Sequence, residues 1–243
     1  MKLSDIYYDS HFGEFEELFR QSGVPVHFRK GEAIPTDYKI RNIFYTVNGL
    51  SKYFFVHENG TEKVTGIFGP GTLIPYSLCL PVSEKNFVYK DYFKSQTLTD
   101  VDAICLKQAT YHKLFESSAA LRTANYDWIA FQHNRYEFET FFLSNCGAFT
   151  KVCNFLYSNS SLYNVYRQNG LILTQDDIGD IIGESRLDVA RAFRNLRDLN
   201  IVSTSRGSVT ILDKEKLFRY APHRVDKQRV KIFNYFRWRA FLC

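Results

Sequence analysis

Arginines recur at helical spacing in the last third of this 243-residue chain, at Arg186, Arg191, Arg194 and Arg197. Ser185 directly precedes them and Asp188 follows three residues later, the spacing of a capping box that starts a helix. An arginine near an exposed helix start can donate two hydrogen bonds to guanine, a contact worth about 1–3 kcal/mol of discrimination. The segment therefore predicts base reading by Arg186 and Arg191. For Arg194 and Arg197 it leaves two alternatives open, phosphate contact or a solvated basic face.

These arginines need a scaffold that presents their helix, and the flanking sequence predicts one. Thr174 and Asp177 form another capping-box pattern, isoleucines follow at helical spacing, and Gly183 ends the segment. Two short helices joined by a glycine-containing turn make a helix-turn-helix. Two β-type runs, 201–204 and 209–212, flank a basic turn and predict a hairpin wing. The expected DNA-contacting residues are Thr174, Gln175, Ser185, Arg186, Leu187, Asp188, Arg191, Arg194 and Arg206.

The charge distribution agrees with a polyanion-binding C-terminal region. Residues 1–169 contain 17 basic and 17 acidic residues, whereas residues 170–243 contain 14 and 9, so the net charge of +5 lies in the last third. In the final segment, 222–243, basic residues alternate with aromatic ones. We expect it to pack as a helix that braces the preceding domain, with nucleic-acid or membrane-surface contact as the alternatives.

The region before these helices predicts an antiparallel β-barrel followed by one long helix. Short Tyr/Phe/Val/Ile-rich runs between 24 and 106 are separated by turn signals about every ten residues. Residues 119–145 contain neither Pro nor Gly, and a heptad pattern in them predicts a helix that pairs with its twin in a homodimer. The alternative is a helix packed on its own barrel. The expected dimer residues are Leu121, Ala124, Trp128, Phe131, Arg135, Phe138 and Phe142.

The segment 173–191, continued by Leu196 and the Arg206 hairpin, is similar to the DNA-binding signature of the Crp/Fnr superfamily of bacterial transcription regulators. The resemblance covers roughly residues 20 to 217 and implies an α+β protein that acts as a homodimer on an inverted-repeat DNA site. It divides the chain into a cyclic-nucleotide-binding-like jelly-roll sensor domain (1–118), a dimerisation helix (119–146), a winged helix-turn-helix domain (147–221) and the C-terminal extension (222–243). Leu187 stands where the family often has a base-reading Glu, so it could touch only a thymine methyl group.

Members of this family sense different effectors, and the residues of this chain argue against two of them. Cyclic-nucleotide binders resemble one another in a Gly-Glu segment and an Arg-Ser pair, but this chain has Gly71-Thr72-Leu73 and no arginine from 82 to 96. An oxygen-sensing iron–sulfur cluster would need amino-terminal cysteines, and none precedes Cys79. Aromatic and lysine side chains instead suit a small aromatic or acidic organic effector, with bulk packing as the alternative. The candidates are Thr72, Leu73, Tyr76, Tyr89, Lys90, Tyr92, Lys94, Trp128 and His133.

Other functions find little support in the sequence. A thiol-based redox switch through Cys146 and Cys153 is one alternative, although buried cysteines more often act as small hydrophobic residues. A second is an effector-binding module whose winged helix contacts protein rather than DNA. The sequence has no enzyme motif, no metal-ligand spacing, no evident cofactor motif, no secretory signal and no apolar run long enough to span a bilayer. We therefore expect a cytoplasmic regulator, which would contact RNA polymerase if it is an activator.

Overall fold

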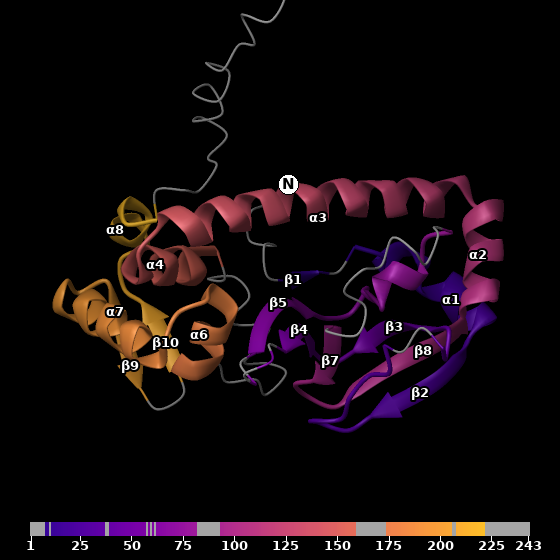
Figure 1. Ribbon diagram of the computed structural model, residues 1–243, viewed down its shortest axis with the longest axis horizontal. Coiled ribbons are helices and arrows are strands. Elements are labelled where there is room, and N and C mark those ends of the chain that lie inside the picture. The colour runs from indigo at the N-terminus through magenta and orange to yellow at the C-terminus, as the bar shows by residue number, and fades with distance from the viewer. Residues whose placement is uncertain are drawn as a thin grey trace, which may run out of the picture.

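The computed structural model describes residues 8–9, 11–36, 39–56, 58, 60, 62–81, 93–158, 174–205 and 208–221. Figure 1 shows a β-rich N-terminal domain and a mainly helical C-terminal domain, with the helix α3 (Ala119–Asn145) running along both. The expected α+β architecture, the long helix and the C-terminal winged domain are confirmed. Arg206 and the segment 222–243 lie outside the described residues.

The N-terminal domain is built from two four-stranded sheets that face each other. They form an open sandwich rather than the expected closed barrel, and β1 pairs parallel with β5, a departure from the all-antiparallel expectation. The first sheet has the order β1 (Tyr8–Asp9), β5 (Glu62–Phe68), β4 (Ser51–Val56) and β7 (Phe93–Thr97). The second has the order β2 (Val24–Phe28), β8 (Val101–Lys107), β3 (Asn42–Asn48) and β6 (Leu73–Ile74).

Alternation along the strands builds the interior between the sheets, because successive side chains point to opposite faces. The buried interior cluster comprises Ile34, Phe44, Phe68, Ile74, Val101 and Ala103. The Asn48-Gly49 turn, one of the turn signals that separate the β-type runs, joins β3 to β4. Gly49 has φ of 86°, and a Cβ atom there would lie 2.0 Å from the Asp100 carbonyl oxygen, so this turn requires glycine.

Helices cover the outer side of the second sheet. The short helices are η2 (Gly13–Phe15), α1 (Glu16–Ser22), η3 (Tyr76–Leu78) and α2 (Gln108–Ser117). Their apolar side chains share one core with the strands and with the start of α3, through residues such as Phe19, Tyr45, Tyr111 and Leu121. The helix α1 contributes the fully buried Phe19 to this core and keeps Glu16, Glu17 and Arg20 on its polar side.

The structure corrects part of the predicted dimer contact. Leu121, Ala124 and Arg135 are buried within a single chain, so this side of α3 covers the chain's own β-domain and is not available to a partner. Trp128 and Phe131 are half-buried on the same side. The heptad pattern is present, but the sequence pattern alone does not say whether these residues contact a partner helix or the chain's own β-domain. The side chains of Phe138 and Phe142 lie outside the described residues.

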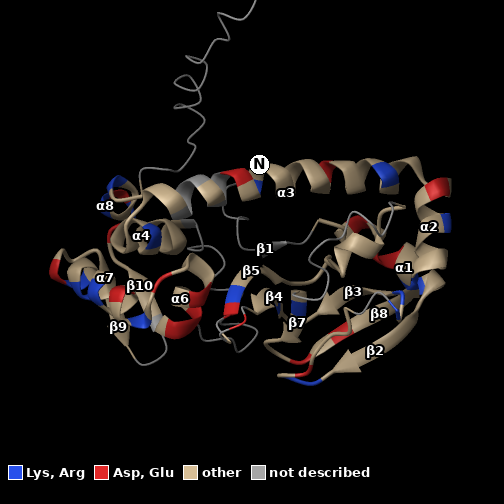
Figure 2. Cartoon of the chain, in the orientation of Figure 1, with Lys and Arg blue, Asp and Glu red and all other residues tan. Residues whose placement is uncertain are grey.

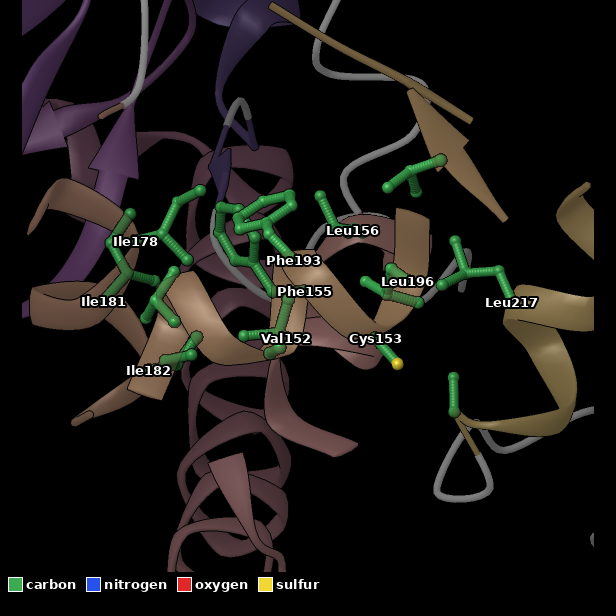
Figure 3. Packing of buried hydrophobic residues seen from close by; sticks show 14 of the residues in the cluster. Val152, Cys153, Phe155, Leu156, Ile178, Ile181, Ile182, Phe193, Leu196 and Leu217 are labelled. Atoms are coloured by element: carbon green, nitrogen blue, oxygen red, sulfur yellow. The ribbon is translucent and has the colours of Figure 1, made fainter. Parts of the chain in front are cut away.

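The C-terminal domain is built around a buried cluster, drawn in part in Figure 3, to which every element after α3 contributes. The cluster continues into the β-domain through Leu50, Phe54, Val64 and Ile67. The elements of the C-terminal domain are α4 (Ala148–Ser158), α6 (Gln175–Ile182), α7 (Arg186–Asp198), β9 (Val202–Ser205), β10 (Ser208–Ile211) and α8 (Lys214–Arg219). The hairpin β9–β10 pairs antiparallel, with Ser205 opposite Ser208, as predicted for the wing. Within the described part of the chain, no helix has the length and apolar character needed to cross a membrane.

Candidate nucleic-acid interface

The turn of the helix-turn-helix follows from local sequence. The Thr174 hydroxyl accepts a hydrogen bond from the Asp177 amide at 3.1 Å, and the Asp177 carboxylate accepts one from the Thr174 amide at 2.7 Å, so the predicted capping box forms. At the other end, Gly183 adopts the left-handed conformation with φ of 69°. Gly179 lets the turn close on α6, because a Cβ atom there would lie 2.6 Å from the Glu184 carbonyl oxygen.

The second helix, α7, starts at the predicted cap. The Ser185 hydroxyl accepts a hydrogen bond from the Asp188 amide at 3.2 Å and donates one to the Asp188 carboxylate at 2.5 Å. Asp188 therefore supports the cap through the serine hydroxyl rather than through the backbone amide of a full capping box. Its negative charge in the first turn also complements the helix dipole.

The first turns of α7 project into solvent. Arg186, Leu187 and Arg191 are all exposed, and Leu187 keeps 59 % of its surface accessible. Arg186 lies 3.7 Å from Asp176 and Arg191 lies 3.2 Å from Asp188, in ion pairs that are well exposed to water. Exposed pairs of this kind contribute little to stability, so a phosphate or a base can replace them at low cost. The opposite face of α7 carries Val189, Phe193 and Leu196 into the core.

The remaining arginines of the predicted set separate into different environments. Arg194 is exposed on α7, where it can meet a phosphate. The Arg197 guanidinium donates a hydrogen bond to the Thr204 hydroxyl at 3.3 Å, so it links α7 to the wing strand β9. Arg197 therefore has a structural partner, which the sequence did not indicate.

The charge on this domain is segregated rather than in excess. Figure 2 shows basic residues along α7 and acidic residues along α6. Residues 174–221 contain equal numbers of basic and acidic side chains, and the net positive charge of the chain comes from 222–243, which has six basic residues and one acidic residue. The row of basic residues on α7, and not a net positive charge of the domain, thus makes this surface a candidate for nucleic-acid binding.

The first helix of the pair, α6, rests on the outer face of the first sheet. Its residues Ile178 and Ile181 share one buried cluster with Phe54 of β4 and Val64 of β5. The Lys63 ammonium donates a hydrogen bond to the Ile181 carbonyl oxygen at the end of α6. We call this contact the α6 seat. It fixes the helix-turn-helix against the β-domain.

Charged groups surround the seat. Lys52 forms an ion pair with Glu62 at 2.5 Å. Burial raises the pKa of the nearby Asp180 carboxyl; Glu62 raises it further, whereas Lys52 opposes the shift. Behind α6, the buried Lys151 of α4 pairs with Glu184 at 2.5 Å and so ties the turn of the helix-turn-helix to its core.

Two of the predicted effector residues meet at the junction of the β-domain and α3. The Tyr76 ring stacks on Trp128 with centroids 3.4 Å apart, and the Tyr76 hydroxyl lies 3.0 Å from both oxygens of Asn125. The Asn125 amide group donates hydrogen bonds to the Tyr111 hydroxyl at 3.0 Å and to the Leu121 carbonyl oxygen at 2.7 Å. This buried network joins the η3 segment to α3.

Leu73 belongs to the buried cluster against which Tyr76 and Trp128 pack, whereas Thr72, Lys94 and His133 are not assembled with them. Thr72 and Leu73 are buried, and the Thr72 hydroxyl donates to the Gly69 carbonyl oxygen at 2.6 Å. Lys94 lies opposite Phe54 on the outer face of β7, and His133 is exposed on the far side of α3, where it pairs with Glu137 at 3.4 Å. Strand alternation and helix rotation place these two side chains away from Trp128. The remaining candidates, Tyr89, Lys90 and Tyr92, lie outside the described residues.

The cysteine environment does not favour the redox alternative. Cys153 is fully buried in the core of the winged domain, and burial raises its thiol pKa to about 12. Burial also raises the pKa of the half-buried Cys146. A disulfide forms through a thiolate, so neither thiol is primed for exchange near neutral pH. Among the described residues, no cluster of His, Cys, Asp or Glu side chains could hold a metal ion.

Two features of the structure have no counterpart in the sequence-based expectations. The α6 seat depends on side chains far apart in the chain, and no local pattern identifies them. The buried placement of Gln132 and Arg135 on α3 is the other. A spacing signal did exist for it, because Leu121, Asn125, Trp128, Gln132 and Arg135 follow one another at intervals of four and three residues.

The fold and the exposed helix start define a winged helix-turn-helix protein joined to a double-sheet sensor-like domain. A profile of the Crp-like helix-turn-helix domain matches residues 150–220. No curated protein sequence matches the chain. The resemblance to the Crp/Fnr superfamily is thereby confirmed: the chain carries a Crp-like helix-turn-helix domain, and its fold is similar to that of a solved structure whose description places it in the crp/fnr family.

Similar solved structures cover nearly the whole fold at low sequence identity. CprK complexed with OCPA matches with a TM-score of 0.65 and 16% identity, over 88% of this chain and 99% of that one. FixK2 from Bradyrhizobium japonicum matches with a TM-score of 0.63 and 16% identity, over 82% and 96%. The c-di-GMP-responsive global regulator CLP from Xanthomonas campestris matches with a TM-score of 0.62 and 13% identity, over 81% and 97%.

Proposed function

We propose that this protein is an effector-responsive transcription regulator, without catalytic activity, that binds an inverted-repeat DNA site as a homodimer. The observation that carries the proposal is the capped and exposed start of α7, where Arg186, Leu187 and Arg191 project together from a Crp-like helix-turn-helix domain. In such domains the second helix enters the major groove with its N-terminal residues toward the bases. Arg191 would read a guanine and Leu187 a thymine methyl group.

The homodimer would form through the outer face of α3. Tyr126 and Tyr136 of α3 are exposed, in contrast to the half-buried Trp128 and Phe131 of the same helix. Together with Ile129, His133 and Thr140, the two tyrosines follow one another at intervals of three and four residues, the spacing of a coiled-coil seam. This row replaces the predicted seam, whose first residues cover the chain's own β-domain.

An effector would act through the domain arrangement. A ligand changes DNA affinity only if it binds one arrangement of the two winged domains better than another. The α6 seat and the hydrogen-bonded junction of Tyr76 with α3 are the contacts through which the β-domain can favour one arrangement. Relatives of this fold include a protein solved with OCPA and one described as c-di-GMP-responsive, which supports small-molecule control as the general mode.

Selection from a random duplex pool with the purified full chain tests the proposal, at near-physiological salt and with and without reductant. We expect enrichment of an inverted repeat with half-site centres about one helical turn apart. Binding to the selected site should weaken by roughly 0.9 log units per neutralised phosphate for each log unit of salt. Binding that is sequence-independent, or that does not respond to salt, would refute DNA regulation and favour a protein partner for the winged helix.

A change of the selected site or affinity with reductant would restore the thiol alternative. The burial and raised pKa of Cys153 lead us to expect no such change. Sedimentation of the protein alone and of the Tyr136→Glu variant tests the dimer, since a glutamate at an apolar seam should shift the protein toward the monomer. An unchanged dimer in that variant would place the interface elsewhere.

A further inference from the structure

An arginine reaches from α3 to the inner face of the first sheet. Arg135 is only 5 % exposed, and its guanidinium lies over Gly66 of β5, where a Cβ atom would stand 3.2 Å from Nη1. Gly66 pairs with Tyr53 of β4, which packs against the interior cluster, so both residues face the space between the sheets. The absence of a side chain at Gly66 therefore makes room for the Arg135 guanidinium.

Three hydroxyl groups face the space between the sheets, two from the first sheet and one from the second. Ser95 is the register partner of Tyr53, and Ser51 is the register partner of the interior residue Phe68. Thr46 lies two residues from Phe44, another interior residue, and so faces the same space. All three are at most 3 % exposed, and within the part of the chain that the structure describes their hydroxyl groups have no hydrogen-bond partner.

Such hydroxyl groups need an explanation. The large majority of buried side-chain polar atoms in proteins are hydrogen-bonded, because one left unpaired has lost its hydration without compensation. A structural role alone would be served better by apolar residues at Ser51 and Ser95. The neighbouring guanidinium keeps its charge at any physiological pH, and it presents five donors in a fork that matches a carboxylate or a phosphate. The chemistry of this face fits a ligand that brings acceptors into the sandwich.

Aromatic rings share this inner face with Gly66 and Ser95. The Tyr53 ring stacks on Phe93 with centroids 4.9 Å apart and planes 11° apart, and it lies 5.8 Å from the Phe68 ring. Rings in this arrangement offer faces and edges to another planar ring. The space between the two sheets is thus lined by a cation, an aromatic surface and hydroxyl groups.

We propose that Arg135 is the anion-reading residue of the effector site, and that the effector is a small aromatic molecule with one carboxylate or phosphate group. The inference rests on the proposed effector response and specifies its chemistry. The guanidinium would hold the anionic group through two parallel hydrogen bonds. The ring would pack against Tyr53 and Phe68, and Ser95 would donate to a polar substituent. Arg135 takes the role that the sequence assigned to Lys90 and Lys94.

Thermal shift of the full chain without DNA tests this chemistry. The probes are benzoate, phenylacetate, 3-phenylpropionate and phenyl phosphate, each at millimolar concentration, with benzamide, phenylacetamide and 3-phenylpropionamide as uncharged matches. We expect at least one anion to raise the melting temperature while the uncharged matches do not. A phosphate response without a carboxylate response would identify the anionic group and support the proposal. No shift with any anion, or equal shifts with anion and amide, would overturn it.

Three variants locate the effect. Arg135→Gln should weaken titrated anion binding about tenfold to a hundredfold, and Arg135→Lys, which keeps the charge but loses the two-pronged geometry, should weaken it less. Lys94→Gln changes an exposed lysine on the outer face of the same sheet and should leave binding unchanged. If Arg135→Gln binds the anions as the unsubstituted protein does, or if Lys94→Gln alone loses them, the assignment is wrong.

The proposed function can fail separately from this inference. Anion binding is measured without DNA, and sequence-selective DNA binding is measured by fluorescence anisotropy without an anion. Anion binding without any selective DNA binding would leave the Arg135 site in place and reject the regulator. Selective DNA binding without anion binding would support the regulator and reject the Arg135 site.

Discussion

Replacing Leu187 with alanine tests whether α7 reads bases in the proposed way. Leu187 is 59 % exposed in the free protein, and full burial of a leucine side chain is worth about 1.5–3 kcal/mol. Covering its exposed part against a thymine methyl group would therefore contribute about 1–2 kcal/mol. We expect Leu187→Ala to weaken binding to the selected site about five- to twentyfold. Folding stability should change by less than about 0.5 kcal/mol, because the side chain lies outside the core.

The assay is fluorescence anisotropy at one fixed salt concentration with the selected duplex, a scrambled duplex and a duplex in which uracil replaces the contacted thymine. Uracil lacks only the methyl group, so the affinity losses caused by Leu187→Ala and by the base change should not be additive. Each change alone should weaken binding, and the second change should weaken it little once the first has been made. Because no charge is lost, the salt dependence should stay the same. Equal losses on selected and scrambled DNA, or fully additive losses, would refute methyl reading.

Three further predictions concern the scaffold. Gly179→Ala should destabilise the winged domain and reduce DNA binding, since its Cβ atom would stand 2.6 Å from the Glu184 carbonyl oxygen; circular dichroism melting and anisotropy check this. Phe54→Ala should lower the free energy of unfolding by about 3–5 kcal/mol in urea titrations because it empties part of the α6 seat; a loss below about 1 kcal/mol would mean that α6 does not rest there. Burial raises the pKa of Cys153 to about 12 from an ordinary 9.0, so Cys153 should resist iodoacetamide at about pH 8, whereas Cys146 should react. The thiol of the unfolded chain ionises first, so the contribution of Cys153 to the free energy of unfolding should be lost as the pH rises from 9.0 toward 12.

The winged domain was predictable because its signals are local. A cap such as Thr174 acts on an amide three residues away, and a left-handed turn at Gly183 is set by one residue. The strands β3, β4 and β5 were predicted for the same reason, since alternation and turn residues identify each one separately. Predictions that required two segments distant in the sequence to meet in space were less accurate. Lys94 and His133 had the right chemistry for an effector site and proved to lie on outer surfaces.

Arg135 illustrates what local patterns leave undetermined. Its place in a heptad row is compatible with a partner helix and with the chain's own sheet, and only the tertiary arrangement chooses between them. The glycine at position 66 accommodates the guanidinium, because a Cβ atom there would stand 3.2 Å from Nη1. The two residues are far apart in the sequence, and neither has a pattern that points to the other. A polar residue in an apolar helix row is thus a reason to search for a site inside the chain as well as for a partner helix.

The two strands β4 and β5 connect the proposed effector site with the α6 seat. Tyr53 and Phe68 face the interior and Arg135, whereas their neighbours Phe54 and Ile67 face the cluster that contains Ile181 of α6. The two surfaces are therefore separated by the thickness of one sheet. A ligand that shifted Tyr53 would have to move Phe54, because adjacent residues share one backbone and packed interiors transmit displacement rather than absorb it. Coupling needs in addition that the ligand prefer one position of these strands. A shift of these strands would reach the DNA-facing helix through the α6 seat, since the position of α6 fixes the direction in which α7 presents Arg191.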